Sequence, residues 1–147
     1  MNGLGVLGRA RFCFGHLLRF PLARRDHPVA AQPMSLEVYA AQNHVLVSPR
    51  GDATGALDRI LVDFGLKRRI ALLVATYLAV PAALAGSDLI ATVPRRVAEQ
   101  IAANANIAIT PLPIDFATTV SMAWHRRATG DPAQSWFRER LTDVAAG

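Results

Sequence analysis

Residues 44–103 read HVLVSPRGDATGALDRILVDFGLKRRIALLVATYLAVPAALAGSDLIATVPRRVAEQIAA, and short apolar runs alternate there with amphipathic ones. Short apolar runs bounded by turn residues are typical of strands, whereas apolar residues at i, i+3, i+4 and i+7 are typical of helices. Strands connected by helices pair in parallel, so the predicted fold class is α/β. The pattern predicts strands at 44–48, 70–75 and 89–93, each followed by a helix, at 57–64, 78–85 and 95–103.

The ends of these elements carry separate signals. Thr54 or Asp52 can cap the first helix, and Gly65 and Gly86 suit the left-handed backbone conformation that ends helices. Pro81 fits its helix only in the first turn, where a backbone N–H is not needed. The second strand, IALLVA, contains no polar residue, which predicts that both of its faces are covered.

The C-terminal part of the chain predicts two more strands and a helix. An apolar run occupies 107–112, and the alternation in TVSMAWH predicts a half-buried strand at 119–125. Asp131 can cap the next helix, with Pro132 at its first position and Gln134 completing a capping box. The expected buried face of that helix consists of Trp136, Phe137, Leu141 and Val144.

The net charge of +5 lies at the N-terminal end of the chain. Residues 1–25 contain five arginines and no acidic residue, whereas the basic residues of the remainder are balanced by its 11 acidic ones. The body therefore has no basic excess for nucleic-acid phosphates, and the cluster Lys67-Arg68-Arg69 is expected at a solvated element end. A lone cysteine, Cys13, excludes a disulfide framework and favours the cytoplasm. No apolar run approaches the roughly 20 residues that a membrane-spanning helix needs.

Catalytic and cofactor signatures find no support in the sequence. Ser48 and Ser121 lack the G-x-S-x-G context of a nucleophile, and His44 and His125 do not have zinc-ligand spacing. The GLGVLG sequence at 3–8 has no preceding strand, so it is not expected to bind a dinucleotide. We therefore expect no enzyme activity, no cofactor and no metal site.

The loops after the three central strands are expected to gather on one rim of the sheet, because the carboxyl ends of parallel strands lie together. Helix N-termini at such a rim offer free backbone amides, which favour an anionic or polar small molecule. The alternative is purely structural, with Thr54 and Thr76 as helix caps and Pro94 as a helix starter.

Four separate segments resemble the effector-binding region of LysR-type transcriptional regulators, in matching order and spacing. They are RRDHP (24–28), HVLVSPRGD (44–52), VPAALAGSDLIATVPRRVA (80–98) and WHRR with DPAQSWFRE (124–139). The resemblance implies a periplasmic-binding-protein-like (type 2) α/β effector domain with one lobe complete and the other partial.

The same resemblance implies a division of the chain. Residues 1–22 are unmatched and are expected to be disordered or artefactual, and residues 23–43 are expected to form part of the first lobe. Residues 44–113 correspond to the second lobe, and residues 114–147 to the return strand and C-terminal helix of the first.

In function, the resemblance implies an effector-binding fragment of a cytoplasmic regulator that senses a small-molecule inducer, for example an aromatic acid. The DNA-reading helices of the family have no counterpart here, so we do not expect this chain alone to bind an operator. We expect a homo- or heterodimer with a regulator of the family. Alternatives are a solute-binding protein of the same fold and a dimerisation fragment that modulates a full-length regulator. The effector contacts implied by the resemblance are Asp52, Thr54, Thr76, Tyr77 and Pro94.

Overall fold

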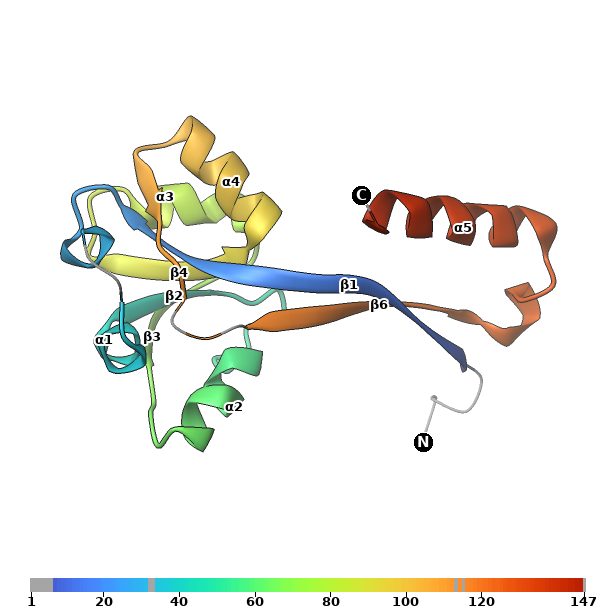
Figure 1. The fold of residues 1–147 in the computed structure, drawn as a ribbon, viewed down its shortest axis with the longest axis horizontal. Helices are drawn as coiled ribbons and strands as arrows, with labels where there is room; N and C mark the ends of the chain where they lie inside the picture. Colours follow the sequence, from blue (N-terminus) through green and yellow to red (C-terminus); the bar gives the residue numbers. More distant parts are fainter. Residues whose placement is uncertain (1–6, 32–33, 113, 115, 147) are drawn as a thin grey trace. The chain divides into compact units, whose positions relative to one another are not determined.

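The structure, a computed structural model, describes residues 7–31, 34–112, 114 and 116–146. It consists of two compact units (Figure 1). One unit is Leu18–Ala117, and the other combines the segments on either side of it. No helix within the described ranges is long and apolar enough to cross a membrane.

The unit Leu18–Ala117 is built on a mixed sheet with the strand order β3-β2-β4-β1-β5. β2 is parallel to β3 and to β4, as the alternating pattern predicted, whereas β1 is antiparallel to β4 and β5. The strands are β1 (Leu7–Arg24), β2 (Asn43–Val47), β3 (Arg69–Val74), β4 (Leu89–Pro94) and β5 (Ile107–Ile109). The helices are α1 (Leu36–Ala41), α2 (Ala56–Asp63), α3 (Val80–Leu84) and α4 (Arg95–Asn104), with short 3-10 turns η1 (Pro28–Ala30) and η2 (Tyr77–Ala79).

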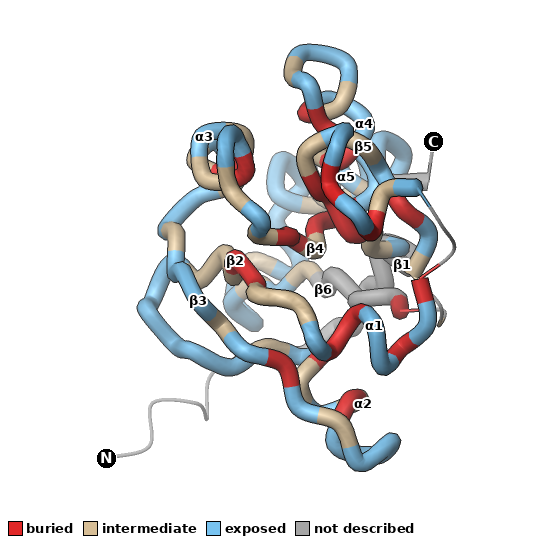
Figure 2. Tube along the Cα trace, turned by 90° about the vertical axis from the view of Figure 1, so that its left-hand side faces the viewer, coloured by how far each residue is buried: buried red, intermediate tan, exposed pale blue. Residues whose placement is uncertain are grey.

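Helices cover both faces of this sheet, α1 and α2 on one and α3 and α4 on the other (Figure 1). Consecutive strand residues point to opposite faces, so Ile90 packs in the core beneath α1 and α2 while Ala91 packs beneath α3 and α4. Figure 2 shows the resulting buried stretches along β4 and α1.

The glycine and proline signals at the helix ends are confirmed, whereas the predicted cap of α2 is wrong. Gly65 and Gly86 have φ of +69° and +71°, and Pro81 lies in the first turn of α3. The N-cap of α2 is Gly55 rather than Thr54 or Asp52, and its N–H donates to Asp58 Oδ2 at 2.6 Å. The carboxylate of the third helical residue thus satisfies the N–H at the helix start.

The expectation that both faces of the second strand are covered is also wrong. β3 is the outermost strand in the sheet order, and among the described strands it pairs only with β2. Leu72 and Leu73 are each 38% exposed, and Figure 2 shows β3 as a largely exposed edge. An apolar run predicts a strand, but its coverage depends on what lies beyond the sheet edge.

β1 begins at Leu7, within the segment 1–22 that the resemblance leaves unmatched, and the expected disorder of that segment stays a prediction. In β1, Arg19 lies opposite Pro94 of β4. Arg24, at the end of the strand, lies opposite Ile107 of β5. Residues 23–43 pack in the same unit as residues 44–113, since Ala23, Met34, Leu36 and Tyr39 share one core cluster with Leu57 and Leu61. The lobe boundaries implied by the resemblance remain a prediction.

The other unit contains β6 (Ala117–His125), which pairs with β1, the 3-10 turn η3 (Arg126–Ala128) and α5 (Pro132–Ala146). The predicted cap is confirmed, because the N–H of Gln134 donates to Asp131 Oδ1 at 2.8 Å. The expected buried face of α5 is wrong, since Trp136, Phe137, Leu141 and Val144 are all exposed. The guanidinium carbon of Arg138 lies 4.6 Å from the centre of the Trp124 ring, so these two side chains pack together.

Candidate functional site

A pocket of about 120 Å³ opens at the rim where the parallel strands β2, β3 and β4 end. All of its walls come from the unit Leu18–Ala117. We call it the rim pocket; it is lined by Arg19, Leu46, Val47, Gly55, Ala56, Leu57, Arg68, Tyr77, Thr92 and Phe116. Parallel strands place their carboxyl ends together, which is why segments far apart in the sequence meet here.

The five predicted effector contacts are distributed around this rim. Tyr77 lines the rim pocket, whereas Asp52 and Thr54 line an adjoining hollow that shares Gly55 with it. Thr76 Oγ1 accepts a hydrogen bond from the N–H of Leu78 at 3.3 Å and so caps η2. Pro94 is buried and directly precedes α4. Contact between any of these five residues and an effector remains a prediction.

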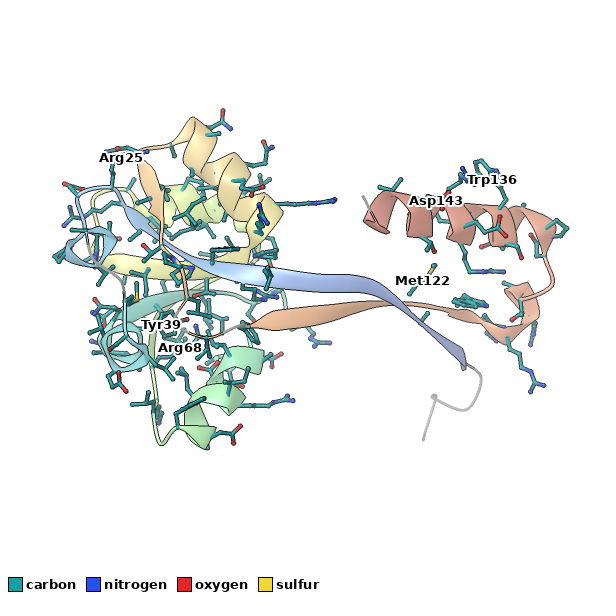
Figure 3. The ribbon with its side chains drawn as sticks, in the orientation of Figure 1. Arg25, Tyr39, Arg68, Met122, Trp136 and Asp143 are labelled. Atoms are coloured by element: carbon teal, nitrogen blue, oxygen red, sulfur yellow. The ribbon has the colours of Figure 1, made fainter. Side chains whose placement is uncertain are left out.

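Sequence reasoning missed the polar groups behind the rim pocket, which form one hydrogen-bonded chain. Arg68 donates through Nε to Asp58 Oδ1 at 2.7 Å and through Nη2 to Asp58 Oδ2 at 3.0 Å. Its Nη1 donates to the hydroxyl of Tyr39 at 3.0 Å, and that hydroxyl lies 2.7 Å from Thr92 Oγ1. Figure 3 shows Tyr39 and Arg68 side by side, and we call the four residues the Asp58–Thr92 chain.

The charge states of this chain follow from its geometry. Burial raises the pKa of Asp58, but the hydrogen bonds from Arg68 and from the Gly55 N–H outweigh it and hold that pKa below its ordinary value. Burial lowers the pKa of Arg68, yet the bonds to Asp58 keep it above its ordinary value. Burial raises the pKa of Tyr39. At neutral pH the Asp58–Thr92 chain therefore contains the ionised carboxylate of Asp58, the charged guanidinium of Arg68 and the protonated phenol of Tyr39.

Arg68 corrects the prediction that its basic cluster is solvated. Its side chain is 3% exposed, whereas Lys67 and Arg69 on either side are exposed. The two partners of its three hydrogen bonds are Asp58, 10 positions away along the chain, and Tyr39, 29 positions away. No local pattern distinguishes a buried arginine from its exposed neighbours, so only the fold identifies it.

His44 is a second buried polar group next to this chain. Its Nε2 bonds to the carbonyl of Tyr39 at 2.9 Å, its ring meets the Tyr39 ring edge-on, and its Nδ1 has no partner among the described residues. Burial, and then the nearby Arg68 charge, lower the pKa of His44 from 6.5 to about 4. Cys13 and Ser121 have side chains outside the described part of the structure.

We expect the stability of this protein to fall as the pH is lowered from about 6.5 to about 4. The unfolded chain then protonates His44 before the folded chain does, so the neutral form stabilises the fold only above this range. The loss should reach about 3 kcal/mol at pH 4. Urea unfolding at several pH values measures it, and His44→Gln should flatten the dependence; an unchanged slope in that variant would contradict the assignment.

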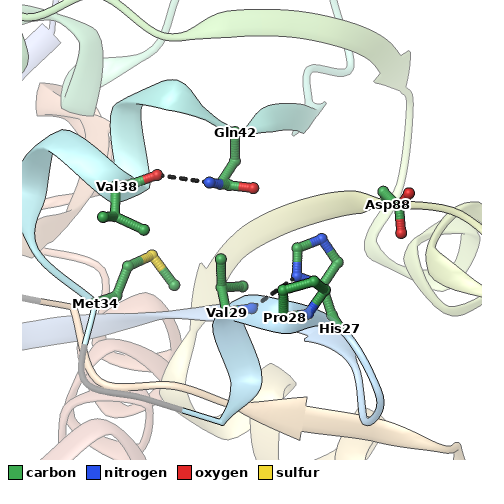
Figure 4. A pocket seen from close by; sticks show the side chains of 7 residues that line it. All are labelled: His27, Pro28, Val29, Met34, Val38, Gln42 and Asp88. Carbon is green, nitrogen blue, oxygen red and sulfur yellow. Dashed lines mark hydrogen bonds between the residues drawn. The ribbon is translucent and has the colours of Figure 1, made fainter.

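A third hollow, of about 470 Å³, lies at the opposite rim, next to residues that precede β2 and β4 (Figure 4). His27 Nδ1 accepts from the Val29 N–H at 3.1 Å, and Gln42 Nε2 donates to the Val38 carbonyl at 2.8 Å. Asp88 at its edge is ion-paired with Arg24 at 2.7 Å. His27 Nε2 is buried and has no hydrogen-bond partner among the described residues. We take the rim pocket as the stronger candidate site because it lies where the loops after the parallel strands meet.

Within the described ranges, no group of three or more histidine, cysteine, aspartate or glutamate residues is placed to hold a metal ion. None of the described residues that line the rim pocket is a histidine, cysteine or serine. Its described walls carry guanidinium, hydroxyl and aromatic groups.

Comparison with known proteins agrees with this picture. The family model of the LysR substrate binding domain matches residues 13–146, which begins ten residues before the segment expected from the resemblance. The HTH-type transcriptional activator NagR of Ralstonia sp is 33% identical over 122 residues, covering 82% of this chain and 40% of NagR. NahR of Pseudomonas putida is 33% identical over 124 residues, covering 84% of this chain and 41% of NahR.

Among solved structures, the regulatory domain of MexT, a transcriptional activator in Pseudomonas aeruginosa, is similar with a TM-score of 0.80 and 34% identity. The match covers 90% of this chain and 64% of that one. The chain spans about two fifths of the length of the curated relatives NagR and NahR. These relatives are transcriptional regulators, not enzymes.

Proposed function

Because this chain belongs to the LysR substrate-binding domain family, we propose that its rim pocket binds a small anionic effector of a transcriptional regulator. The observation that carries the proposal is the lining of the pocket, in which the guanidinium of Arg19 joins that of Arg68, the latter already ion-paired with Asp58. Among the described lining residues none is acidic. A guanidinium is the preferred protein partner of a carboxylate, because its donors match the carboxylate oxygens. The relatives support the same class of function, since they activate transcription.

The shape of the rim pocket supports an aromatic acid as the effector. Its volume of about 120 Å³ limits the occupant to a small molecule. Tyr77 and Phe116 offer aromatic faces and edges to a flat ring. The Arg19 guanidinium lies 5.7 Å from the centre of the Phe116 ring, so a cationic group and an apolar wall meet in one place.

The chain spans about two fifths of NagR and NahR, so DNA binding and the choice of target genes belong in this proposal to the rest of such a regulator. The alternative of a transported solute has the same pocket chemistry but a different physiological role. Operator binding that responds to the effector in the whole regulator would separate the two, because a transport protein has no operator.

The proposal is tested by calorimetric titration of the purified chain with benzoate and salicylate, with benzyl alcohol as a neutral analogue. We expect the two carboxylates to bind and the alcohol not to bind. Replacing Arg19 with glutamine should weaken carboxylate binding about tenfold, because a charge-assisted hydrogen bond is lost.

Arg69→Gln is the matched control, since Arg69 is exposed at the start of β3 and is not among the described residues that line the rim pocket. It should leave binding unchanged. Equal binding of benzoate and benzyl alcohol, or an equal effect of the two arginine substitutions, would contradict the proposal.

A further inference from the structure

We propose that the hydroxyl of Thr92 is a fixed hydrogen-bond donor into the rim pocket, so the effector must present an acceptor such as a carboxylate or carbonyl oxygen there. This inference rests on the proposed function, because it concerns the molecule that the rim pocket binds. It names Thr92 as a residue that determines specificity and Tyr39 as the residue that positions its proton.

The direction of the Asp58–Thr92 chain begins at Arg68. A guanidinium has donors only, so the 3.0 Å contact between Arg68 Nη1 and the Tyr39 hydroxyl has the phenol oxygen as its acceptor. The two bonds from Arg68 to the carboxylate of Asp58 hold the guanidinium in this orientation. The direction of the hydrogen bond from Arg68 to Tyr39 therefore does not depend on a bound ligand.

The phenol of Tyr39 has one hydrogen, and that hydrogen needs an acceptor because Tyr39 is completely buried. Among the described residues, the tyrosine hydroxyl has two polar contacts, Arg68 and Thr92 Oγ1. Arg68 cannot accept. The Tyr39 proton therefore points to Thr92 Oγ1 across the 2.7 Å contact.

Thr92 Oγ1 accepts the hydrogen bond from Tyr39, so the hydrogen of the Thr92 hydroxyl points elsewhere. Within the described part of the chain, the Thr92 side chain has no other hydrogen bond, and it lines the rim pocket. A hydroxyl whose oxygen already accepts a strong bond is best used as a donor. An effector oxygen in the pocket can accept from it, whereas an ammonium group, which only donates, cannot.

The first experiment compares two substitutions of Thr92 in the whole chain, with benzoate as the probe. Thr92→Val keeps the shape but removes the hydroxyl, and it should weaken benzoate binding roughly tenfold or more, since the acceptor is charged. Thr92→Ser keeps the hydroxyl and should stay within about twofold of the unsubstituted chain. Equal affinities for the valine and serine variants would overturn the inference.

A second measurement needs no ligand. Neutron diffraction from deuterated crystals of the chain places the hydroxyl deuterium atoms directly. We expect deuterium on Tyr39 Oη along the line to Thr92 Oγ1. Deuterium on Thr92 Oγ1 that points at Tyr39 would overturn the inference.

The two experiments separate this inference from the proposed function. Benzoate binding that is insensitive to Thr92→Val leaves the proposed function intact and overturns the role of Thr92. Absence of binding by benzoate and salicylate overturns the proposed function, while the neutron map still decides the direction of the donor.

Discussion

Replacing Asp58 with asparagine is expected to lower the free energy of unfolding by about 3–5 kcal/mol. The substitution leaves the Arg68 guanidinium, whose side chain is 3% exposed, without its charge partner inside the protein. The asparagine can still accept one hydrogen bond but cannot balance the charge. Urea denaturation at neutral pH measures the loss.

Glu99→Gln is the matched control for this substitution, because Glu99 pairs with Arg95 at 2.8 Å on the exposed surface of α4. The same chemical change there should cost no more than about 0.5 kcal/mol, since solvent screens exposed pairs. Similar losses in the two variants would show that the Asp58–Arg68 pair does not hold this unit together.

Replacing Leu61 with alanine is the second large effect, with an expected loss of about 2–5 kcal/mol in the free energy of unfolding. Leu61 is fully buried in the cluster that joins α1 and α2 to Ile90 and Phe116. Removing its methyl groups forfeits their transfer free energy and leaves a cavity that the surrounding side chains fill only partly.

The neighbouring position on the same helix supplies the control. Val62 is 68% exposed, so Val62→Ala should change the stability by less than about 0.5 kcal/mol. Thermal unfolding followed by circular dichroism compares the two variants. A Leu61→Ala protein as stable as Val62→Ala would contradict the assignment of Leu61 to the core.

The Asp58–Thr92 chain connects stability with recognition in this protein. Arg68 is buried and pairs with the partly exposed Asp58. Arg68 and Thr92 both line the rim pocket. A residue that stabilises the fold therefore also orients a group that we propose to contact the effector. Variants of Thr92 alone are the better test of binding, because they leave the buried ion pair in place.

Much of the secondary structure was predictable because it depends on neighbours along the chain. The parallel strands β2, β3 and β4 formed where apolar runs predicted them, and the helices after them ended at Gly65 and Gly86. The Asp131 cap of α5 was predictable for the same reason. The resemblance to LysR-type regulators was confirmed by the family model.

The sequence by itself thus determined the periodicity, the helix ends and the family, all of which are encoded within short stretches of residues. The tertiary structure decided which apolar surfaces are covered, leaving β3 at an edge and Trp136 exposed, and it selected Gly55 as the cap of α2. It also decided which polar groups meet at the site, because Tyr39 and Thr92 are 53 positions apart and come together only across the sheet. Burial and hydrogen-bond partnership are properties of the packed chain, so they follow from the arrangement of elements and not from the local order of residues.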